Sequence, residues 1–315
     1  MPNLQPLLNK AAIPLMLGVA AFCCAGPAAA EARVEKNVVY GMYSGLALLM
    51  DVHYPEKPNG LGVVFVSGSG WTSRTVYDAP PLKEQQIDEW GPSLLRAGHT
   101  VFAINHRATP RFHYPAPVED VQRAVRFVRH GAKQYGIDPA KLGGVAGSSG
   151  GHLIGLVAML GASGLAGDAD AVNREPATLQ CVVLRAAPTD LQKMIGGRAV
   201  GTAAVTAFVG RLPTPNPEDQ EVCRAASPIS HVSASSPPTL LLHGDADDTV
   251  PFQQSVAMEA ALRAAKVPVK LVRVVGGAHG PNFGTGGKPH AQFGEVLNQS
   301  VAWLDQYLKG AAAAK

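Results

Sequence analysis

A serine flanked by glycines lies where a strand is expected to turn into a helix. Residues 147–151, Gly-Ser-Ser-Gly-Gly, match the pattern G-x-S-x-G with Ser149 at its centre. A serine hydroxyl becomes an effective nucleophile only when it is exposed beside a base, and a sharp strand-to-helix turn exposes it. Glycines on either side let the strand and the helix approach closely. The pattern therefore predicts that Ser149 is the nucleophile of an acyl-transfer reaction.

A base and an acid follow later in the chain, in the order Ser, Asp, His that α/β folds with such a serine turn use. His279 comes after one apolar run, and Asp245, Asp247 and Asp248 come after another. Ligands bind at the carboxyl ends of parallel strands, where these residues are expected. We predict that His279 takes the serine proton while a carboxylate fixes its tautomer. Chain order leaves all three aspartates open as the acid.

A loop of small residues could stabilise the negative charge that develops on a substrate oxygen. Residues 67–71, Ser-Gly-Ser-Gly-Trp, follow an apolar run, and their backbone can approach a substrate closely. We predict that the amides of Ser69 and Gly70, together with that of Gly150, form an oxyanion hole. Removal of one such donor typically raises the barrier by about 3 kcal/mol.

Short apolar runs alternate with amphipathic stretches along most of the chain, and this alternation predicts an α/β fold with a mostly parallel sheet. Strands are expected at 38–43, 46–54, 63–66, 101–104, 142–146, 181–184, 240–242 and 271–275. Helices are expected at 82–96, 118–134, 150–160, 253–265 and 292–308. Residues 31–315 are predicted to form a single domain, with a short cap over the site at about residues 190–232, which lack a clear period.

The first 30 residues have the pattern of a signal peptide. Lys10 precedes an apolar stretch over residues 11–25, and residues 27–30, Pro-Ala-Ala-Ala, offer the small side chains of a cleavage site. A retained anchor is the alternative, but the stretch is shorter than the roughly 20 residues that span a bilayer. We expect export to the periplasm or medium, without a stable membrane anchor.

Composition narrows the function further. Hydrophobic residues make up 46% of the chain and charged residues 16%, which is enough apolar material for a large core. The net charge of +3 is spread without long like-charged runs, so no nucleic-acid partner is expected. The remaining histidines lack metal-site spacing, and neither a metal nor an organic cofactor is expected. Cys181 and Cys223 would remain after cleavage, either paired or as buried thiols.

Several motifs in the same order resemble the α/β-hydrolase superfamily, in the esterase and lipase branch related to hormone-sensitive lipase and to small feruloyl or acetyl esterases. The resemblance covers nearly all of the chain after the leader. It rests on Leu-Leu-Met-Asp-Val-His-Tyr-Pro at 48–55, Arg-Ala-Thr-Pro at 107–110, Tyr-Pro-Ala-Pro-Val-Glu-Asp at 114–120, Tyr-Gly-Ile-Asp-Pro at 135–139, Ala-Ser-Pro-Ile-Ser at 226–230 and His243 to Pro251.

The resemblance implies an eight-stranded sheet and carboxylic ester substrates. In that family the acid is the first residue of a D-x-x-V-P string, which here is Asp247. Two strings depart from the family pattern. Its His-Gly-Gly-Gly-Trp loop is Ser-Gly-Ser-Gly-Trp at 67–71, and its Gly-Asp-Ser-Ala-Gly-Gly string is matched by Gly-Ser-Ser-Gly-Gly at 147–151. Because backbone amides survive side-chain changes, we expect altered acyl preference rather than loss of activity.

These observations predict an exported serine esterase that acts on small carboxylic esters, including acylated carbohydrates or phenolic esters, as a monomer or homodimer. The triad of Ser149, Asp247 and His279 would serve an amidase or peptidase equally well, and that alternative stays open. A hydrolase-fold binding module without activity is the third hypothesis. It is disfavoured because all three members of a triad are present.

Overall fold

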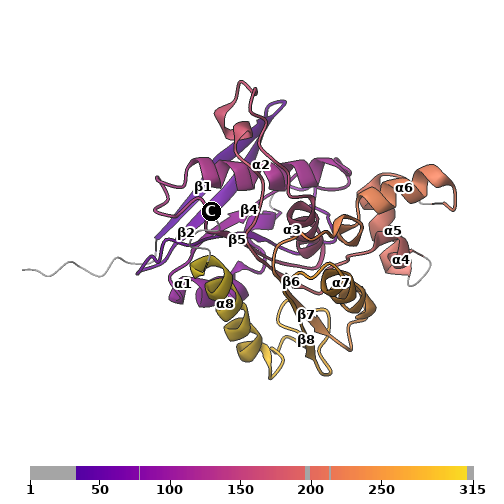
Figure 1. The fold of residues 1–315 in the computed structure, drawn as a ribbon. Coiled ribbons are helices and arrows are strands. Elements are labelled where there is room, and N and C mark those ends of the chain that lie inside the picture. The colour runs from indigo at the N-terminus through magenta and orange to yellow at the C-terminus, as the bar shows by residue number, and fades with distance from the viewer. Residues whose placement is uncertain (1–32, 78, 196–198, 213, 311–315) are drawn as a thin grey trace, which may run out of the picture.

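One sheet of eight strands forms the centre of the molecule, in the order β1-β2-β4-β3-β5-β6-β7-β8 (Figure 1). The computed structural model describes residues 33–77, 79–195, 199–212 and 214–310, so the predicted signal peptide lies outside the described residues. The strands are β1 Arg33–Tyr43, β2 Leu46–Tyr54, β3 Gly62–Val66, β4 Thr100–Ile104, β5 Leu142–Gly147, β6 Val182–Arg185, β7 Thr239–Gly244 and β8 Val269–Val274.

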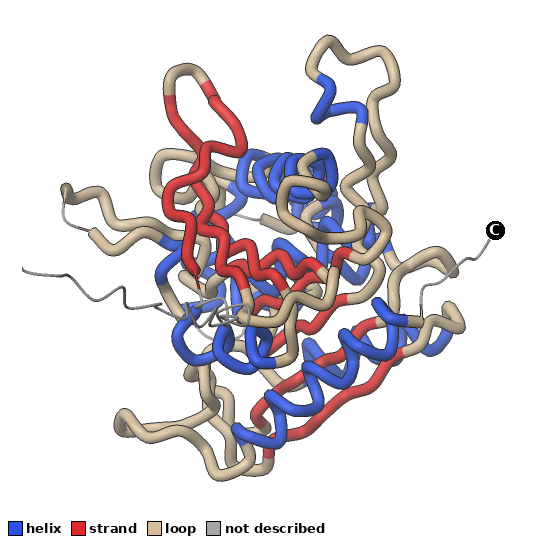
Figure 2. Tube along the Cα trace, turned by 90° about the vertical axis from the view of Figure 1, so that its left-hand side faces the viewer, coloured by secondary structure: helices blue, strands red, loops and turns tan. Residues whose placement is uncertain are grey.

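The sheet is parallel from β4 to β8, and β2 is antiparallel to both β1 and β4. In Figure 2 the strands form a continuous twisted surface with helices on either side. The structure confirms the predicted mostly parallel, eight-stranded sheet. Every parallel strand therefore ends at one edge, where the loops after β3, β5, β7 and β8 meet.

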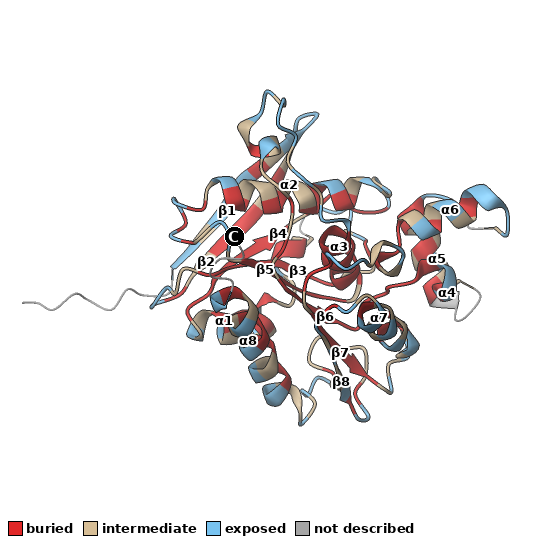
Figure 3. Cartoon of the chain, in the orientation of Figure 1, coloured by how far each residue is buried: buried red, intermediate tan, exposed pale blue. Residues whose placement is uncertain are grey.

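Helices cover both faces of this sheet (Figure 1). These helices are α1 Ile87–Arg96, α2 Ala116–His130, α3 Ser148–Leu160, α7 Gln253–Ala264 and α8 Phe293–Lys309. Apolar residues of α2, α3 and α7 share one buried cluster, and those of α1 and α8 share another. Along β3, Val64 and Val66 belong to the first cluster and Val63 and Phe65 to the second, because side chains alternate between the faces of a strand. Figure 3 shows this buried layer along the strands.

A cap was predicted between β6 and β7, and the described residues of this segment form three α-helices and a 3-10 helix at Pro228–His231. The α-helices are α4 Leu191–Met194, α5 Ala199–Val209 and α6 Pro217–Ala225. Phe208 of α5 is fully buried and stacks on Trp71, with 4.7 Å between ring centroids. The inserted helices therefore pack directly against the loop that follows β3.

The two cysteines expected in the mature chain are both free and buried, Cys181 beside β6 and Cys223 in α6. Burial raises the pKa of the Cys181 thiol to about 12, so this thiol stays protonated and unreactive near neutral pH. Across the described ranges, no helix is long and apolar enough to cross a membrane.

Candidate active site

Three side chains from separate strand ends meet at the carboxyl edge of the sheet. Ser148 Oγ lies 2.9 Å from His279 Nε2, and His279 Nδ1 lies 2.7 Å from Asp247 Oδ2. Ser148 follows β5, Asp247 follows β7 and His279 follows β8. Because a carboxylate only accepts hydrogen bonds, Nδ1 of the imidazole carries the proton and Nε2 offers a lone pair to the serine.

Ser148, not Ser149, is the serine beside His279, so the structure corrects the sequence prediction. The chain bends at Ser148, whose φ of 52° lies in the left-handed region that non-glycine residues rarely adopt. Ser149 is the next residue of α3, is 1% exposed, and its Oγ accepts a hydrogen bond from the Ser69 amide at 2.9 Å. The strained turn therefore exposes the hydroxyl one residue earlier than the pattern suggested.

The signal for this position was present in the sequence. Residues 146–151 read Ala-Gly-Ser-Ser-Gly-Gly, and their final Gly-Gly aligns with the end of the family's Gly-Asp-Ser-Ala-Gly-Gly string. In that alignment Ser148 occupies the serine position and Ala146 replaces the first glycine. The prediction failed because G-x-S-x-G was started at the glycine at position 147, which puts Ser149 at its centre.

The turn requires a glycine at position 150, two residues after Ser148. A Cβ at Gly150 would collide with the carbonyl oxygen of Val66 and would lie 2.6 Å from that of Ser67. The start of α3 thus lies directly on the end of β3, which brings the loop at residues 67–71 to the serine. Because the chain bends at Ser148, the amide that follows the exposed serine belongs to Ser149. The Ser149 amide therefore takes the place that the sequence prediction gave to the Gly150 amide as an oxyanion donor.

Backbone hydrogen bonds hold the loop after β3 beside the strand-to-helix turn at residues 147–150, which is called the elbow below. The Gly68 amide donates to Gln86 Oε1 at 3.2 Å, and Gln86 Nε2 donates back to the Gly68 carbonyl at 3.0 Å. The Ser69 amide donates to Ser149 Oγ, as described above. Gly70 and Trp71 both have positive φ, 65° and 59°, so the loop turns sharply over the site. The predicted donors Ser69 and Gly70 therefore lie in a fixed loop beside Ser148.

Asp247 is the aspartate that contacts His279. Its Oδ1 accepts hydrogen bonds from the amides of Thr249 and Val250, both at 2.8 Å, and its side chain is fully buried. Burial alone would raise the pKa of Asp247, but hydrogen bonds from His243 and His279 outweigh it and hold the pKa well below the ordinary value. The carboxyl group is therefore ionised beside the imidazole at neutral pH.

The neighbouring aspartates have other partners. Asp245 accepts hydrogen bonds from Arg273 Nε at 2.7 Å and from the Gly276 amide at 2.6 Å, which ties the end of β7 to the end of β8. Asp248 Oδ1 accepts a hydrogen bond from the Thr249 hydroxyl at 3.1 Å. His243 Nε2 lies 3.3 Å from Asp247 Oδ2, and His243 Nδ1 lies 2.7 Å from Ser255 Oγ. His243 is therefore a second imidazole in contact with the Asp247 carboxylate.

His152 connects the elbow helix to the loop after β3 and to the inserted helices. Its Nδ1 accepts a hydrogen bond from Trp71 Nε1 at 3.1 Å, and its Nε2 donates to the Ala226 carbonyl at 2.7 Å. Complete burial lowers the pKa of His152 to about 4, against which the Ala226 hydrogen bond acts weakly. The neutral imidazole is thus a fixed part of the wall behind Trp71.

The depressed pKa of His152 predicts a loss of stability in acid. The unfolded chain binds this proton below about pH 6.5 and the folded chain only near pH 4, so stability present above 6.5 is lost as pH falls. The difference between these two pKa values corresponds to roughly 3 kcal/mol of the free energy of unfolding. His152→Gln, which cannot titrate, is expected to remove this part of the pH dependence. Urea unfolding of both proteins between about pH 7 and pH 4.5 measures it; parallel curves would contradict it.

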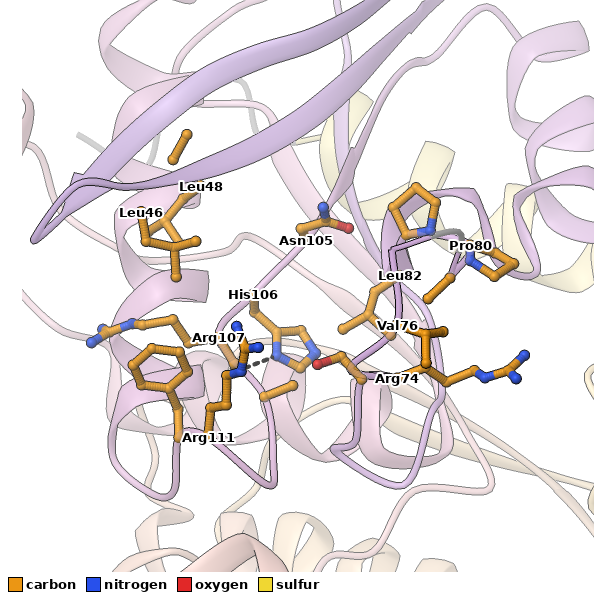
Figure 4. Close-up of a pocket in the computed structure, with 16 residues that line it drawn as sticks. Leu46, Leu48, Arg74, Val76, Pro80, Leu82, Asn105, His106, Arg107 and Arg111 are labelled. Carbon is orange, nitrogen blue, oxygen red and sulfur yellow. Dashed lines mark hydrogen bonds between the residues drawn. The ribbon is translucent and has the colours of Figure 1, made fainter.

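A hollow of about 250 Å³ lies at the same edge of the sheet, between the start of β2, residues 73–76, residues 79–82 and residues 105–112 (Figure 4). Leu46 and Leu48 line one side of it, and Leu82 lies across from them. Neither Ser148 nor His279 lines this hollow. Within the described ranges, no group of three histidine, cysteine, aspartate or glutamate residues could hold a metal ion.

The strand order, the strained serine at the end of β5 and its contact with a histidine that is bonded to a buried aspartate define an α/β-hydrolase of the esterase and lipase type. Residues 50–262 match the model of the BD-FAE family, and the chain belongs to this family. The resemblance inferred from the motifs is thereby confirmed.

Known relatives include esterases. Esterase LipQ of Mycobacterium tuberculosis is 30% identical over 248 residues, which cover 76% of this chain and 55% of LipQ, so the chain spans about half of that relative. A solved carbohydrate esterase from gut microbiota superposes with a TM-score of 0.68 at 26% identity, covering 86% of this chain and 96% of its own. An acetyl ester-xyloside bifunctional hydrolase from Caldicellulosiruptor lactoaceticus superposes with a TM-score of 0.65 at 26% sequence identity. The superposition covers 84% of this chain and 87% of that hydrolase.

Proposed function

We propose that this protein is a serine esterase that hydrolyses small carboxylic esters. The observation that carries the proposal is the continuous chain of contacts from Ser148 Oγ through His279 to Asp247, at 2.9 and 2.7 Å. These distances are those of hydrogen bonds between a nucleophile, a base and the group that orients the base. The names of the related esterases support the same activity.

In the proposed reaction, His279 Nε2 takes the proton of Ser148 as its oxygen attacks the ester carbonyl carbon. The imidazolium then gives that proton to the departing alcohol, which leaves an acyl group on Ser148. Water repeats the sequence, releases the acid and restores the serine. Asp247 stays ionised throughout and stabilises the imidazolium.

The carbonyl oxygen becomes negative in both steps, and backbone amides are proposed to bind it. The Ser149 amide is the donor from α3, whose N-terminal dipole adds to the attraction. Gly70 of the loop at residues 67–71 is the proposed second donor. The Ser69 amide is engaged by Ser149 Oγ in this structure and would have to turn away from that oxygen to contribute.

The substrate class is tested with matched esters and amides. We expect hydrolysis of p-nitrophenyl acetate, and faster hydrolysis of short-chain than of long-chain acyl esters. Acetylated sugars and phenolic esters are tested next, the sugars because two solved relatives are a carbohydrate esterase and an acetyl ester-xyloside hydrolase. The corresponding anilide serves as the control. Turnover of the anilide at the rate of the ester would favour an amidase, and no turnover of any ester together with no fluorophosphonate labelling would contradict the proposal.

Export is a separate part of the proposal. Lys10, the apolar residues 11–25 and the small residues 27–30 support a cleavable signal peptide. Expression of the full chain in a bacterial host, followed by mass spectrometry of the periplasmic and cytoplasmic fractions, tests it. The expected product is a periplasmic chain that begins near residue 31, and an uncut chain in the cytoplasm would contradict it.

A further inference from the structure

Arg185 is a buried cation in the middle of the carboxyl edge of the sheet. It is the last residue of β6, is 1% exposed, and lies between β5 and β7 in the sheet. Throughout the described part of the chain, no carboxylate comes within ion-pair distance of its guanidinium. A buried charge without a paired carboxylate is expensive, so its presence calls for a compensating interaction.

The guanidinium is compensated in part: Nη1 donates to the loop that carries the base, whereas Nε has no hydrogen-bond partner among the described residues. Arg185 Nη1 lies 2.7 Å from the His279 carbonyl oxygen and 3.0 Å from that of Gly280. The same loop is closed by hydrogen bonds between Phe283 and both Gly280 and Ala278, each at 2.9 Å. The Phe283 ring is buried, with its centroid 5.9 Å from the guanidinium carbon. One side chain thus fixes the backbone of the histidine itself.

Another part of the guanidinium lies against Gly147, the residue before the Ser148 nucleophile. A Cβ at Gly147, the residue before Ser148, would lie 2.5 Å from Arg185 Nη2 and 2.9 Å from its Cζ. A side chain at position 147 would therefore displace the guanidinium from its present place. Arg185 separates the elbow from the His279 loop and contacts both.

The cation keeps its charge at neutral pH. Burial lowers the pKa of Arg185 to about 10, while the charge of Asp247 acts in the opposite direction. A guanidinium with that pKa is almost fully protonated near pH 7. It therefore donates its hydrogen bonds permanently and adds a positive potential that favours the ionised form of Asp247.

We propose that Arg185 is a positioning residue, whose guanidinium sets the spacing between the Ser148 elbow and the His279 loop. The inference rests on the proposed function, since it concerns how the same three side chains are held at reacting distance. It assigns no contact with the substrate. Its loss should therefore affect turnover more than substrate binding, and should do so without removing any member of the triad.

A matched control exists in the same fold. Arg129 of α2 is also buried, at 7% exposure, and donates to the carbonyls of Pro139, Pro176 and Thr178. Those residues precede β5 and β6, so Arg129 lies at the opposite edge of the sheet from the site. Arg129→Ala and Arg185→Ala both remove a buried guanidinium from backbone carbonyls, but only the second does so beside the triad.

The test compares kcat and KM for p-nitrophenyl acetate, and the rate of fluorophosphonate labelling, in folded wild type, Arg185→Ala and Arg129→Ala. We expect kcat of Arg185→Ala to fall about 100-fold, the order expected when reacting groups are displaced by about 1 Å. KM should stay near the wild-type value, and low-millimolar guanidinium should restore part of kcat. Arg129→Ala should lose thermal stability and keep its kcat.

Other outcomes would overturn the proposal. Unchanged kcat in folded Arg185→Ala, or an equal loss in Arg129→Ala, would show a purely structural role. If Arg185→Ala does not fold, Arg185→Lys is measured instead. Its single ammonium reaches fewer carbonyls, so an intermediate kcat is expected and a wild-type kcat would refute the inference. Inactive wild-type protein that resists the probe would refute the proposed esterase function itself, which keeps the two failures distinct.

Discussion

Ser148→Ala is expected to lower kcat for ester hydrolysis by at least about 10,000-fold, because it removes the only hydroxyl that contacts His279 Nε2 in the described structure. Ser149→Ala is expected to cost less than the roughly 100-fold that loss of an oxyanion donor causes. Its hydroxyl accepts a hydrogen bond from Ser69, but the backbone amides remain. The adjacent serines thus give a matched pair of variants one residue apart.

The measurement combines steady-state kinetics with a fluorophosphonate probe. Labelled wild-type protein, digested and sequenced by mass spectrometry, should carry the probe on Ser148. Ser149→Ala should be labelled normally and Ser148→Ala not at all, with circular dichroism spectra unchanged in both. An inactive Ser149→Ala beside an active Ser148→Ala would contradict the geometry and restore the interpretation drawn from the sequence pattern.

The fold could be predicted largely from hydrophobic patterning. The apolar runs that predicted strands at 46–54 and 101–104 correspond to β2 at 46–54 and β4 at 100–104. Buried parallel strands produce such runs because both of their faces are covered. Helix ends were less accurate. The predicted helix at 82–96 is a short 3-10 turn followed by α1, because the chain passes through a left-handed residue, Gln86, before α1 begins.

The site could be predicted in part. His279 follows the last strand as expected, and Asp247, selected by the family resemblance, lies against it at 2.7 Å. The elbow serine was misplaced because a string pattern does not encode where the backbone turns. That position depends on the φ of one residue and on how closely α3 lies against β3.

Arg185 could not have been found from local sequence. In the chain it is simply a basic residue that ends an apolar run. Its partners are the carbonyls of His279 and Gly280, more than ninety positions later, and only the parallel order of β6, β7 and β8 brings them together. Contacts between a side chain and distant backbone carbonyls leave no motif, because carbonyls are the same at every residue.

The inserted helices and the oxyanion loop show the same dependence on tertiary structure. Trp71 is packed between His152 of α3 and Phe208 of α5, with ring centroids 5.1 and 4.7 Å away. A change in α5 can therefore reach the loop at residues 67–71 through one aromatic ring. This coupling gives the least regular part of the sequence a direct influence on the groups that are proposed to hold the substrate oxygen.

Asp247→Asn is expected to lower kcat by about 10,000-fold while the protein stays folded. The carboxylate accepts the proton-bearing Nδ1 of His279, and an amide in its place can donate instead and so favour the wrong tautomer. Nε2 would then carry a proton toward Ser148 and could no longer remove one. Because the imidazole stays in place and only its tautomer changes, KM should change little.

Asp245→Asn is the matched control, two residues away in the same turn. Asp245 is bonded to Arg273 and to the Gly276 amide, so its substitution should loosen the link between β7 and β8 and cost stability rather than turnover. Steady-state kinetics on both variants, with thermal unfolding to establish the folded fraction, decides between them. Equal losses of kcat in Asp247→Asn and Asp245→Asn would mean that the whole turn positions His279 and that Asp247 has no special role. Full activity in Asp247→Asn would show that Asp247 is not a member of the triad. The pairing of an ionised, buried Asp247 with His279 is therefore the part of the site that a single isosteric substitution tests most directly.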